Sequence, residues 1–373
     1  MTTAESTQRL DAPAAAAPRA ETPPLSWLAI LDYVAPTFGL GFMFLLIAIY
    51  LMKFATDVLG MSAAVMGTIL FLGRGIWDAV ADPIAGYLSD RTNTRLGRRR
   101  PWLLASALPL GVTFVLLWSP PRGAGPTEAI VWMTIMVVAF YTSTTVLIIP
   151  HTALGAELTD SYHDRTRIFG GRHVMTTLGS FAAVAGLFAL QRSSDVHRTV
   201  LVLAIAAGVA TALATVWTVV RMRERPEFQG RGAAHPYRAF RDVVRNPHAR
   251  LLLLVFGIES LGSATIGVLT PYVAQYVLRR PEVAPPIIAV YMVANIAFVP
   301  VWLPLSRRFG KKALWLASML LTAVSFGCMI FLYENAVTLM TVLAFLAGTA
   351  ASCGAMMGPS IQADVIDWDE HAT

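Results

Sequence analysis

Charged residues are scarce in this chain. Asp, Glu, Lys and Arg make up 14% of its 373 residues, whereas hydrophobic residues make up 55%. A soluble domain carries about a quarter charged residues, so this chain has too little polar surface to fold in water. The composition excludes an ordinary soluble domain and indicates a protein that lies in a membrane.

Cysteine is almost absent, and the sequence lacks the motifs of several kinds of binding and catalytic site. Cys328 and Cys353 both lie in apolar runs, where we expect buried thiols and not a disulfide framework. The sequence contains no glycine-rich nucleotide loop, no metal-ligand spacing of His and Cys, and no Ser/His/Asp arrangement. We therefore expect no enzymatic activity, no cofactor and no step driven by ATP.

Long apolar runs are what the chain has in abundance. Ten runs are each long enough to cross a hydrocarbon core of about 30 Å as a helix. They predict an all-α protein that crosses the membrane repeatedly. The predicted spans are 28–52, 60–88, 101–119, 129–155, 173–191, 199–220, 249–278, 285–305, 312–333 and 337–362.

The basic residues are unevenly distributed between the loops. Of 29 Lys and Arg residues, 20 fall in the loops after the second, fourth, sixth and eighth runs. The positive-inside rule places these loops, and the N-terminus with them, in the cytoplasm. The net charge of +6 is thereby explained without nucleic acid as a partner. We expect a monomer in the plasma (inner) membrane, with the lipid bilayer around it.

The predicted organisation has four parts. Residues 1–26 are rich in Ala, Pro and Thr and lack a signal-peptide pattern, which predicts a disordered cytosolic tail. Residues 27–222 form a six-helix bundle, and the arginine-rich stretch 223–248 is a cytosolic linker. Residues 249–373 contain the first four helices of a second bundle.

An internal repeat supports this division. Leu88–Arg91 is echoed by Leu305–Arg308, and Ala156–Asp160 by Ala363–Asp367. Parallel helical repeats around a central cavity are a building plan of secondary transporters. The second repeat reaches only its fourth helix before Thr373, so we expect two further helices of about 60 residues in the complete arrangement. The alternative is a protein with ten helices.

Ionisable residues at bilayer depth are costly and mark function. Arg74, Asp78 and Asp82 are spaced four apart in the second run, and therefore share one helical face. Asp78 lies about 18 Å along the helix from Asp90, near the bilayer midplane. Two carboxylates beside a cation can bind sodium or share a proton, so Asp78 and Asp82 are the predicted cation site. The alternative is a structural ion pair between Arg74 and Asp78.

The end of this run and the loop after it contain Gly86-x-x-x-Asp90-Arg91 and then Gly97-Arg98-Arg99-Arg100, which resemble the loop signature of the major facilitator superfamily. We interpret it as a cytosolic gating motif, whose charges pair with neighbouring helix ends and separate as the bundles rock; the alternative is a plain topological anchor. The motif residues are Gly86, Asp90, Arg91, Gly97, Arg98, Arg99 and Arg100.

Two longer stretches carry a narrower resemblance. They are Trp77-Asp78-Ala-Val-Ala-Asp82-Pro83-x-x-Gly86 and Asp90-Arg91-Thr-x-Thr-Arg95-x-Gly97-Arg98-Arg99-Arg100-Pro101-Trp102. Together with shorter matches over residues 30–373, they resemble the glycoside–pentoside–hexuronide:cation symporters, the melibiose-carrier family. The resemblance implies a major facilitator fold and cation-coupled sugar transport. By position, Asp78 and Asp82 match the cation-site aspartates of that family, and Arg172, at the start of the fifth run, matches an arginine that holds sugar.

Three positions depart from the family pattern. Gly41 and Ile148 stand where that family has carboxylates for sugar hydroxyls, and Ala81 replaces an amide-bearing residue of the cation site. Sodium needs several oxygen ligands, so the depleted site favours a proton over sodium, although both ions stay open.

Further polar residues are predicted to line the substrate cavity. For His151 the alternative is a packed helix-end residue, and for Glu259 and Asn295 it is an interhelical hydrogen bond. With Arg172, the predicted substrate-binding residues are Arg74, Trp77, Thr145, His151, Glu259 and Asn295.

The sequence thus predicts symport of a sugar or glycoside with H+ or Na+ by alternating access. An exporter or a carrier of lipid-like solutes on the same fold is one alternative, favoured by the missing carboxylates at Gly41 and Ile148. A non-functional, truncated gene product is the other.

Overall fold

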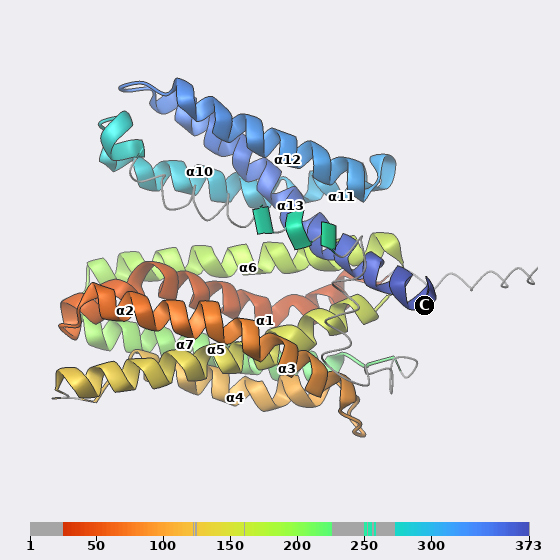
Figure 1. Cartoon of the computed structure of the whole chain (residues 1–373), viewed down its shortest axis with the longest axis horizontal. Helices are drawn as coiled ribbons and strands as arrows, with labels where there is room; N and C mark the ends of the chain where they lie inside the picture. The colour runs from red at the N-terminus through yellow and green to blue at the C-terminus, as the bar shows by residue number, and fades with distance from the viewer. Residues whose placement is uncertain are drawn as a thin grey trace, which may run out of the picture.

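The computed structural model describes residues 25–121, 123, 125–159, 161–225, 250–251, 253–255, 257–258 and 273–372, which are almost entirely helical (Figure 1). Most of the predicted tail and linker, and Glu259 in the seventh predicted run, lie outside the described residues.

The first half of the chain contains seven α-helices and three π-helical segments among the described residues. They are α1 (Trp27–Leu46), η1 (Ile47–Leu51), η2 (Phe54–Val58), α2 (Ala63–Leu70), η3 (Phe71–Ile76), α3 (Trp77–Arg91), α4 (Arg100–Leu117), α5 (Pro126–Glu157), α6 (Tyr162–Gln191) and α7 (Val196–Arg221). The described second half contains η5 (Val273–Val277), η6 (Pro281–Val283), α10 (Ala284–Ala297), α11 (Val299–Phe309), α12 (Lys311–Gly327), η7 (Cys328–Phe331) and α13 (Val337–Ala372).

The described helices account for most of the predicted membrane spans. Eight are long and apolar enough to cross a bilayer, and α10 with α11 makes a ninth that is bent by 46°. The bend falls where Pro300 enters the helix, because proline cannot donate the hydrogen bond of the preceding turn. The run predicted at 249–278 lies mostly outside the described residues.

The fifth predicted run begins earlier than expected. Helix α6 starts at Tyr162, whereas the apolar run was placed at 173–191. The added turns carry Arg165, Arg167 and Arg172, which lower the hydropathy, but each of these side chains is hydrogen-bonded inside the protein. The prediction that Arg172 lies at the helix start is therefore wrong, because it is the eleventh residue of α6.

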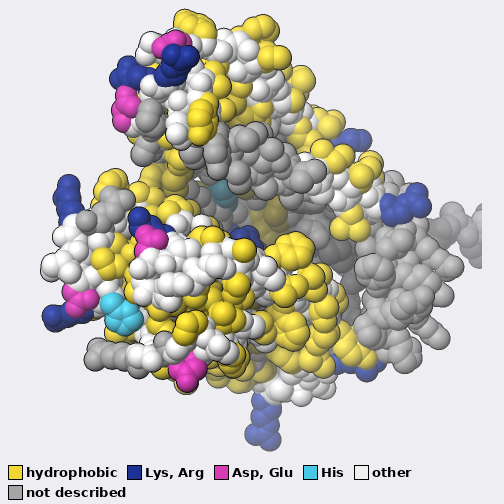
Figure 2. Space-filling model, turned by 60° about the vertical axis from the view of Figure 1, so that its left-hand side comes forward, with side chains coloured by type: hydrophobic (Ala, Val, Ile, Leu, Met, Phe, Trp, Pro, Cys, Tyr) yellow, Lys and Arg dark blue, Asp and Glu magenta, His cyan; other side chains and the backbone are white. Residues whose placement is uncertain are grey.

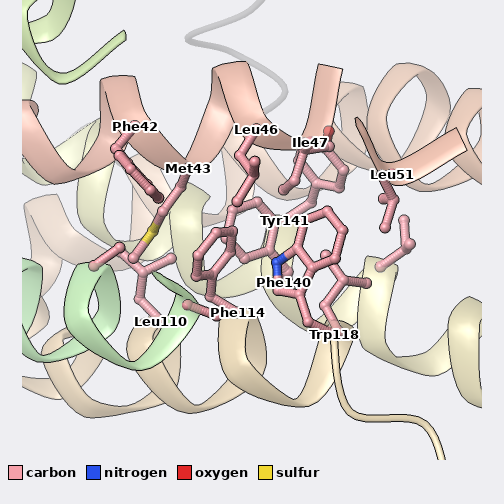
Figure 3. Close-up of a cluster of buried hydrophobic side chains, with 14 of the residues drawn as sticks. Phe42, Met43, Leu46, Ile47, Leu51, Leu110, Phe114, Trp118, Phe140 and Tyr141 are labelled. Carbon is pink, nitrogen blue, oxygen red and sulfur yellow. The ribbon is translucent and has the colours of Figure 1, made fainter. Parts of the chain in front are cut away.

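Aromatic side chains fill the centre of the first bundle (Figure 3). The ring of Trp118 lies 5.3 Å from that of Phe54 and 6.1 Å from that of Phe114, and Phe114 lies 5.7 Å from Phe140. Water is absent from a bilayer core, so helix association there depends on such close packing and on interhelical hydrogen bonds. Hydrophobic side chains also cover much of the outer surface seen in Figure 2.

Glycines bring α1 and α6 into direct backbone contact. A Cβ atom at Gly41 would lie 1.9 Å from the carbonyl oxygen of Thr176, and one at Gly179 would lie 1.8 Å from that of Phe38. Small residues permit this approach between membrane helices. Position 41 therefore has no room for any side chain, which is a structural reason for the missing carboxylate there.

The two halves of the chain meet along α6, which lies against α10, α11 and α13 (Figure 1). The packing is tight at Gly170, where a Cβ atom would lie 2.7 Å from Sδ of Met356. Helix α6 therefore contacts both halves, and its side chains can link them.

Candidate transport site

Three predicted residues surround one cavity in the first bundle. Arg74 on η3 and Asp78 and Asp82 on α3 line a space of about 120 Å³. The rest of the lining comes from α1 and α5, namely Phe44, Tyr141, Thr144, Thr145, Ile148 and Ile149. The three side chains that the four-residue spacing places on one helical face thus line one side of this cavity.

The two carboxylates of the cavity have different surroundings. Thr145 donates its hydroxyl to Oδ1 of Asp82 at 2.9 Å. Oδ1 of Asp78 is buried and accepts no hydrogen bond from any described residue. A buried carboxylate oxygen in this condition is costly, so Asp78 is the group of the cavity that has most to gain from a bound cation.

The segment before α3 is wider than an α-helix. Residues Phe71–Ile76 form π-helical turns, and Arg74 lies within them. π-turns in helices often mark functional sites because they redirect side chains. Trp77 follows at once, and its indole N–H donates to the hydroxyl of Thr142 at 2.8 Å, which ties α3 to α5 beside the cavity.

Arg172 and His151 lie elsewhere in the first bundle. Arg172 donates to the hydroxyl of Thr152 at 2.6 Å. The ring of His151 stacks on that of Tyr33 with centroids 4.2 Å apart. Nε2 of His151 lies 2.8 Å from the carbonyl oxygen of Tyr33, and the Tyr33 hydroxyl donates to the carbonyl of His151 at 2.8 Å. His151 is thus enclosed in a contact between α1 and α5 and does not line the cavity.

Asn295 forms an interhelical hydrogen bond, as the alternative interpretation of this residue predicts. Its side-chain oxygen is bonded to Nε2 of His173 on α6. His173 was not singled out from the sequence, where it follows Arg172 without a motif of its own. Glu259 lies outside the described residues.

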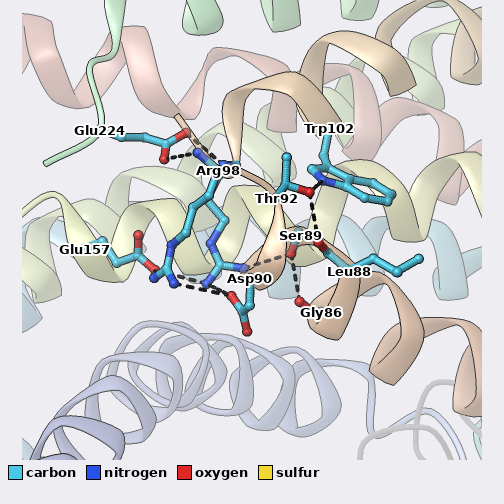
Figure 4. A network of polar contacts seen from close by, with 10 residues as sticks. Gly86, Leu88, Ser89, Asp90, Thr92, Arg98, Trp102, Glu157 and Glu224 are labelled. Atoms are coloured by element: carbon cyan, nitrogen blue, oxygen red, sulfur yellow. Dashed lines mark hydrogen bonds and ion pairs between the residues drawn. The ribbon is translucent and has the colours of Figure 1, made fainter. Parts of the chain in front are cut away.

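The gating motif forms an ionic cluster at one end of the first bundle (Figure 4). Glu157 at the end of α5 accepts from Arg98 at 2.6 Å and from Arg99 at 3.0 Å. Arg99 also lies 2.5 Å from Asp90 and donates to the hydroxyl of Ser89 at 2.9 Å. The cluster holds the loop between α3 and α4 against α5.

A residue that sequence analysis missed completes this cluster. The Glu224 carboxylate accepts backbone hydrogen bonds from Arg98, Arg99 and Arg100 at 2.7, 2.8 and 2.7 Å. It thereby caps the N-terminus of α4, where the N–H groups lack partners within the helix and favour negative charge. The only clue in the sequence is that Glu224 is an acidic residue within an arginine-rich stretch.

The other motif residues support the same junction. Arg100 donates through Nε to the carbonyl oxygen of Val219 at 2.8 Å. The Arg91 guanidinium lies 4.7 Å above the ring of Tyr87. Gly86 faces α5, where a Cβ atom would lie 3.7 Å from the Ile149 side chain.

Gly97 should be intolerant of substitution. Its φ is +105°, and a Cβ atom there would lie 2.5 Å from the Glu224 carboxylate carbon. Gly60 also has positive φ, +66°, but has open space around it. Backbone strain costs about 1–3 kcal/mol at such positions. We expect Gly97→Ala to lower the thermal midpoint of the purified protein further than Gly60→Ala does, and equal decreases would contradict a steric role for Glu224.

The second repeat carries a related ionic contact that crosses between the halves. Lys311, which follows Gly310 as Arg98 follows Gly97, lies 2.6 Å from Oδ2 of Asp364. Arg165 of α6 lies 3.1 Å from Oδ1 of the same carboxylate. Glu157, the residue of the first repeat that corresponds to Asp364, pairs with Arg98 and Arg99 of its own bundle. Asp364 instead joins α12 and α13 to α6.

The helical architecture is the major facilitator fold. The solved structure of the fucose:proton symporter of Escherichia coli matches this chain with a TM-score of 0.67 at 10% identity, covering 91% of this chain and 90% of that one. The chain belongs to the family described as MFS/sugar transport protein, whose model matches residues 33–373. The predicted resemblance to glycoside–pentoside–hexuronide:cation symporters is confirmed, and the protein is a multi-pass membrane transporter and not an enzyme.

Curated relatives are similar over much of the chain. The inner membrane symporter YicJ of Escherichia coli is 27% identical over 335 residues, which cover 87% of this chain and 70% of that protein. The isoprimeverose transporter of Lactiplantibacillus pentosus is 28% identical over 308 residues, which cover 80% of this chain and 63% of that protein. The chain spans between 37% and 77% of the length of such relatives.

Proposed function

We propose that this protein moves a sugar or glycoside together with H+ or Na+ by alternating access, in the plasma (inner) membrane. The observation that carries the proposal is the cavity between α3 and α5, where Asp78 and Asp82 lie beside Arg74. Ionisable groups at bilayer depth are retained for ion or substrate handling. The sugar class is supported by the family and by the relative that transports isoprimeverose.

Asp78 and Asp82 would bind the coupling ion jointly. With both carboxylates and Arg74 ionised, the cavity has a net charge of −1, so one bound H+ or Na+ makes it neutral. The two carboxylates are half-buried, and this partial burial favours the neutral cavity because an unbalanced charge is poorly solvated there. Tyr141, Thr144 and Thr145 supply further oxygen atoms in the lining, which leaves Na+ as well as H+ compatible with the site.

Arg74 and Thr145 are proposed to connect solute binding to the ion, because they line the cavity with the carboxylates. Trp77 is proposed to assist them, because it precedes Asp78 and bonds Thr142 of α5. Arg172 and Asn295 are proposed substrate ligands on α6 and α10. We assign His151 a structural role in the contact between α1 and α5. Alternating access would require the bundle-crossing pair of Arg165 with Asp364 to open and close.

The proposal is tested by reconstituting the chain into vesicles and imposing a pH or a Na+ gradient. Labelled isoprimeverose, L-fucose and methyl β-D-glucuronide form the panel of solutes. We expect uptake of at least one solute above that of protein-free vesicles, and stimulation by one of the two gradients. Absence of uptake for the whole panel under both gradients would contradict sugar symport. Transport in the outward direction alone would favour the exporter.

The proposed orientation makes a separate prediction. Leu96 is exposed between α3 and α4, on the side proposed to be cytosolic. In a background with Cys328 and Cys353 replaced by alanine, Leu96→Cys should resist a membrane-impermeant thiol reagent added to intact cells. Asp57→Cys, at the opposite end of the first bundle, should react. Efficient labelling of the first variant and protection of the second would invert the topology.

A further inference from the structure

His173 and Asn295 connect the two halves of the chain inside the membrane region. His173 lies eleven residues after the first residue of α6, which places it about 17 Å along the helix. Asn295 of α10 is 6% exposed, and its side-chain oxygen is hydrogen-bonded to Nε2 of His173. Since a carboxamide oxygen can only accept, the imidazole donates. Neither side chain has a role in the cation cavity.

The internal repeat places Asn295 at the position of Asp78. Ser306 follows Ser89 by 217 residues, Pro300 follows Pro83 by the same number, and Asn295 follows Asp78 likewise. Ser89 and Ser306 also share a local contact, because each donates to the carbonyl oxygen three residues earlier, at 2.9 and 2.7 Å. The repeat thus matches a neutral carboxamide in the second half with the proposed ion-site carboxylate of the first half.

The other polar contacts described between α6 and the second half lie at one end of the helix. Arg165 pairs with Asp364, and the hydroxyls of Thr166 and Ser360 lie 3.3 Å apart. Arg165 and Thr166 precede His173 by eight and seven residues, which is about two helical turns. Their contacts close the interface near the proposed cytosolic side. The contact between His173 and Asn295 is therefore placed where a solute at mid-membrane would meet both halves.

The hydrogen bond between His173 and Asn295 must break when the two halves rock apart. When the halves separate, the hydrogen bond between the imidazole and the carboxamide breaks in a region of low polarity. A buried polar group without a partner costs about 1–3 kcal/mol, so another hydrogen-bonding group must take the vacated place. Arg172 does not fill this role here, because it bonds Thr152 of α5 on another side of α6.

We propose that His173 and Asn295 form a binding subsite for neighbouring hydroxyl groups of the transported solute. The imidazole offers a donor and an acceptor nitrogen, and the carboxamide offers two donors and an acceptor oxygen. Two adjacent hydroxyls of a neutral sugar, each able to donate and accept, match this set. The solute exchanges the direct bond between the two side chains for one bond to each. This assignment rests on the proposed sugar transport.

The test compares the unmodified chain with three groups of variants. His173→Leu and Asn295→Leu remove the hydrogen-bonding groups, His173→Gln retains a donor and an acceptor, and the double leucine variant completes a cycle. Ser180→Ala serves as the control, because Ser180 lies on α6 but bonds Gly41 and Thr176 within the first half. Uptake kinetics and the shift of the thermal midpoint on adding isoprimeverose, L-fucose or methyl β-D-glucuronide are both measured.

We expect KM for the transported solute to rise at least tenfold in either leucine variant, with a smaller change in maximal rate. The effect of the double variant should be smaller than the sum of the two single effects, because the two side chains are in contact and bind adjacent hydroxyls of one solute. His173→Gln should restore part of the affinity, and Ser180→Ala should keep the parental KM. The stabilisation of the protein by solute should fall in parallel.

Each contrary result has a distinct meaning. Unchanged KM and unchanged stabilisation in the leucine variants, with intact transport, would overturn the subsite and leave sugar symport standing. Solute stabilisation that depends on His173 without any uptake would support the subsite and contradict transport. If no panel solute is transported or stabilises the unmodified chain, both proposals fall.

Discussion

Vesicles containing the Asp78→Asn variant should lose the ability to concentrate solute while keeping part of their downhill exchange. Asparagine retains the shape and one oxygen, but it carries neither the charge that binds Na+ nor a proton that can be moved. One elementary charge crossing the membrane supplies about 2.3 kcal/mol per 100 mV, and this drive is lost with the ion site. The ratio of internal to external solute at steady state measures the effect.

The matched control is Asp57→Asn. Asp57 is an exposed carboxylate paired with Lys53 at 3.6 Å and lies outside the cavity, so its loss should leave accumulation unchanged. Asp82→Asn should resemble Asp78→Asn if the two carboxylates share one ion. Accumulation at the parental ratio in Asp78→Asn would show that this residue is only a structural partner of Arg74.

Asp364→Asn should weaken the contact between the two halves. Its carboxylate is shared by Lys311, which is 0% exposed, and by Arg165, which is 4% exposed. Removing one partner of a buried ion pair costs about 3–5 kcal/mol, and we expect about 2–3 kcal/mol here because a quarter of the Asp364 side chain is exposed. The thermal midpoint of the purified protein should fall accordingly.

Loss of this contact should also expose the interface to reagents. Ser360 is buried against Thr166, so a Ser360→Cys reporter in the background without native cysteines should react slowly. Adding Asp364→Asn should accelerate its labelling from the proposed cytosolic side. Asp164→Asn, which removes a pair with Arg167 inside the first half, should destabilise the protein without this acceleration. Equal labelling rates in the two variants would refute a gating role for Asp364.

Local periodicity predicted a large part of the candidate cation site. Arg74, Asp78 and Asp82 recur every four residues, and this spacing places side chains on one face whichever helices surround them. The structure brings all three to one cavity. The loop glycine Gly97 was equally visible, because a motif glycine points to a backbone position that other residues cannot adopt.

Contacts between segments that are far apart along the chain could not be predicted from the sequence. Glu224 reaches the N-terminus of α4 from more than 120 positions away, and His173 meets Asn295 across a similar separation. The repeat relates Asn295 to Asp78, but no repeat or periodic pattern pairs it with His173, and none pairs Glu224 with α4. The boundary error at α6 has a related cause, because two of the arginines that lower its hydropathy, Arg165 and Arg172, bond side chains of other helices.

The sequence by itself determined the membrane environment, the helical class, the repeat and the candidate residues for a cation site, because these follow from composition and local spacing. Only the tertiary structure decided how those residues are used. It placed Ile148 in the cavity wall, left no space at Gly41, enclosed His151 against Tyr33 and joined Asp364 to α6. The reason is physical: the surroundings of a buried polar group depend on which helices pack against it, and that packing is a property of the whole chain.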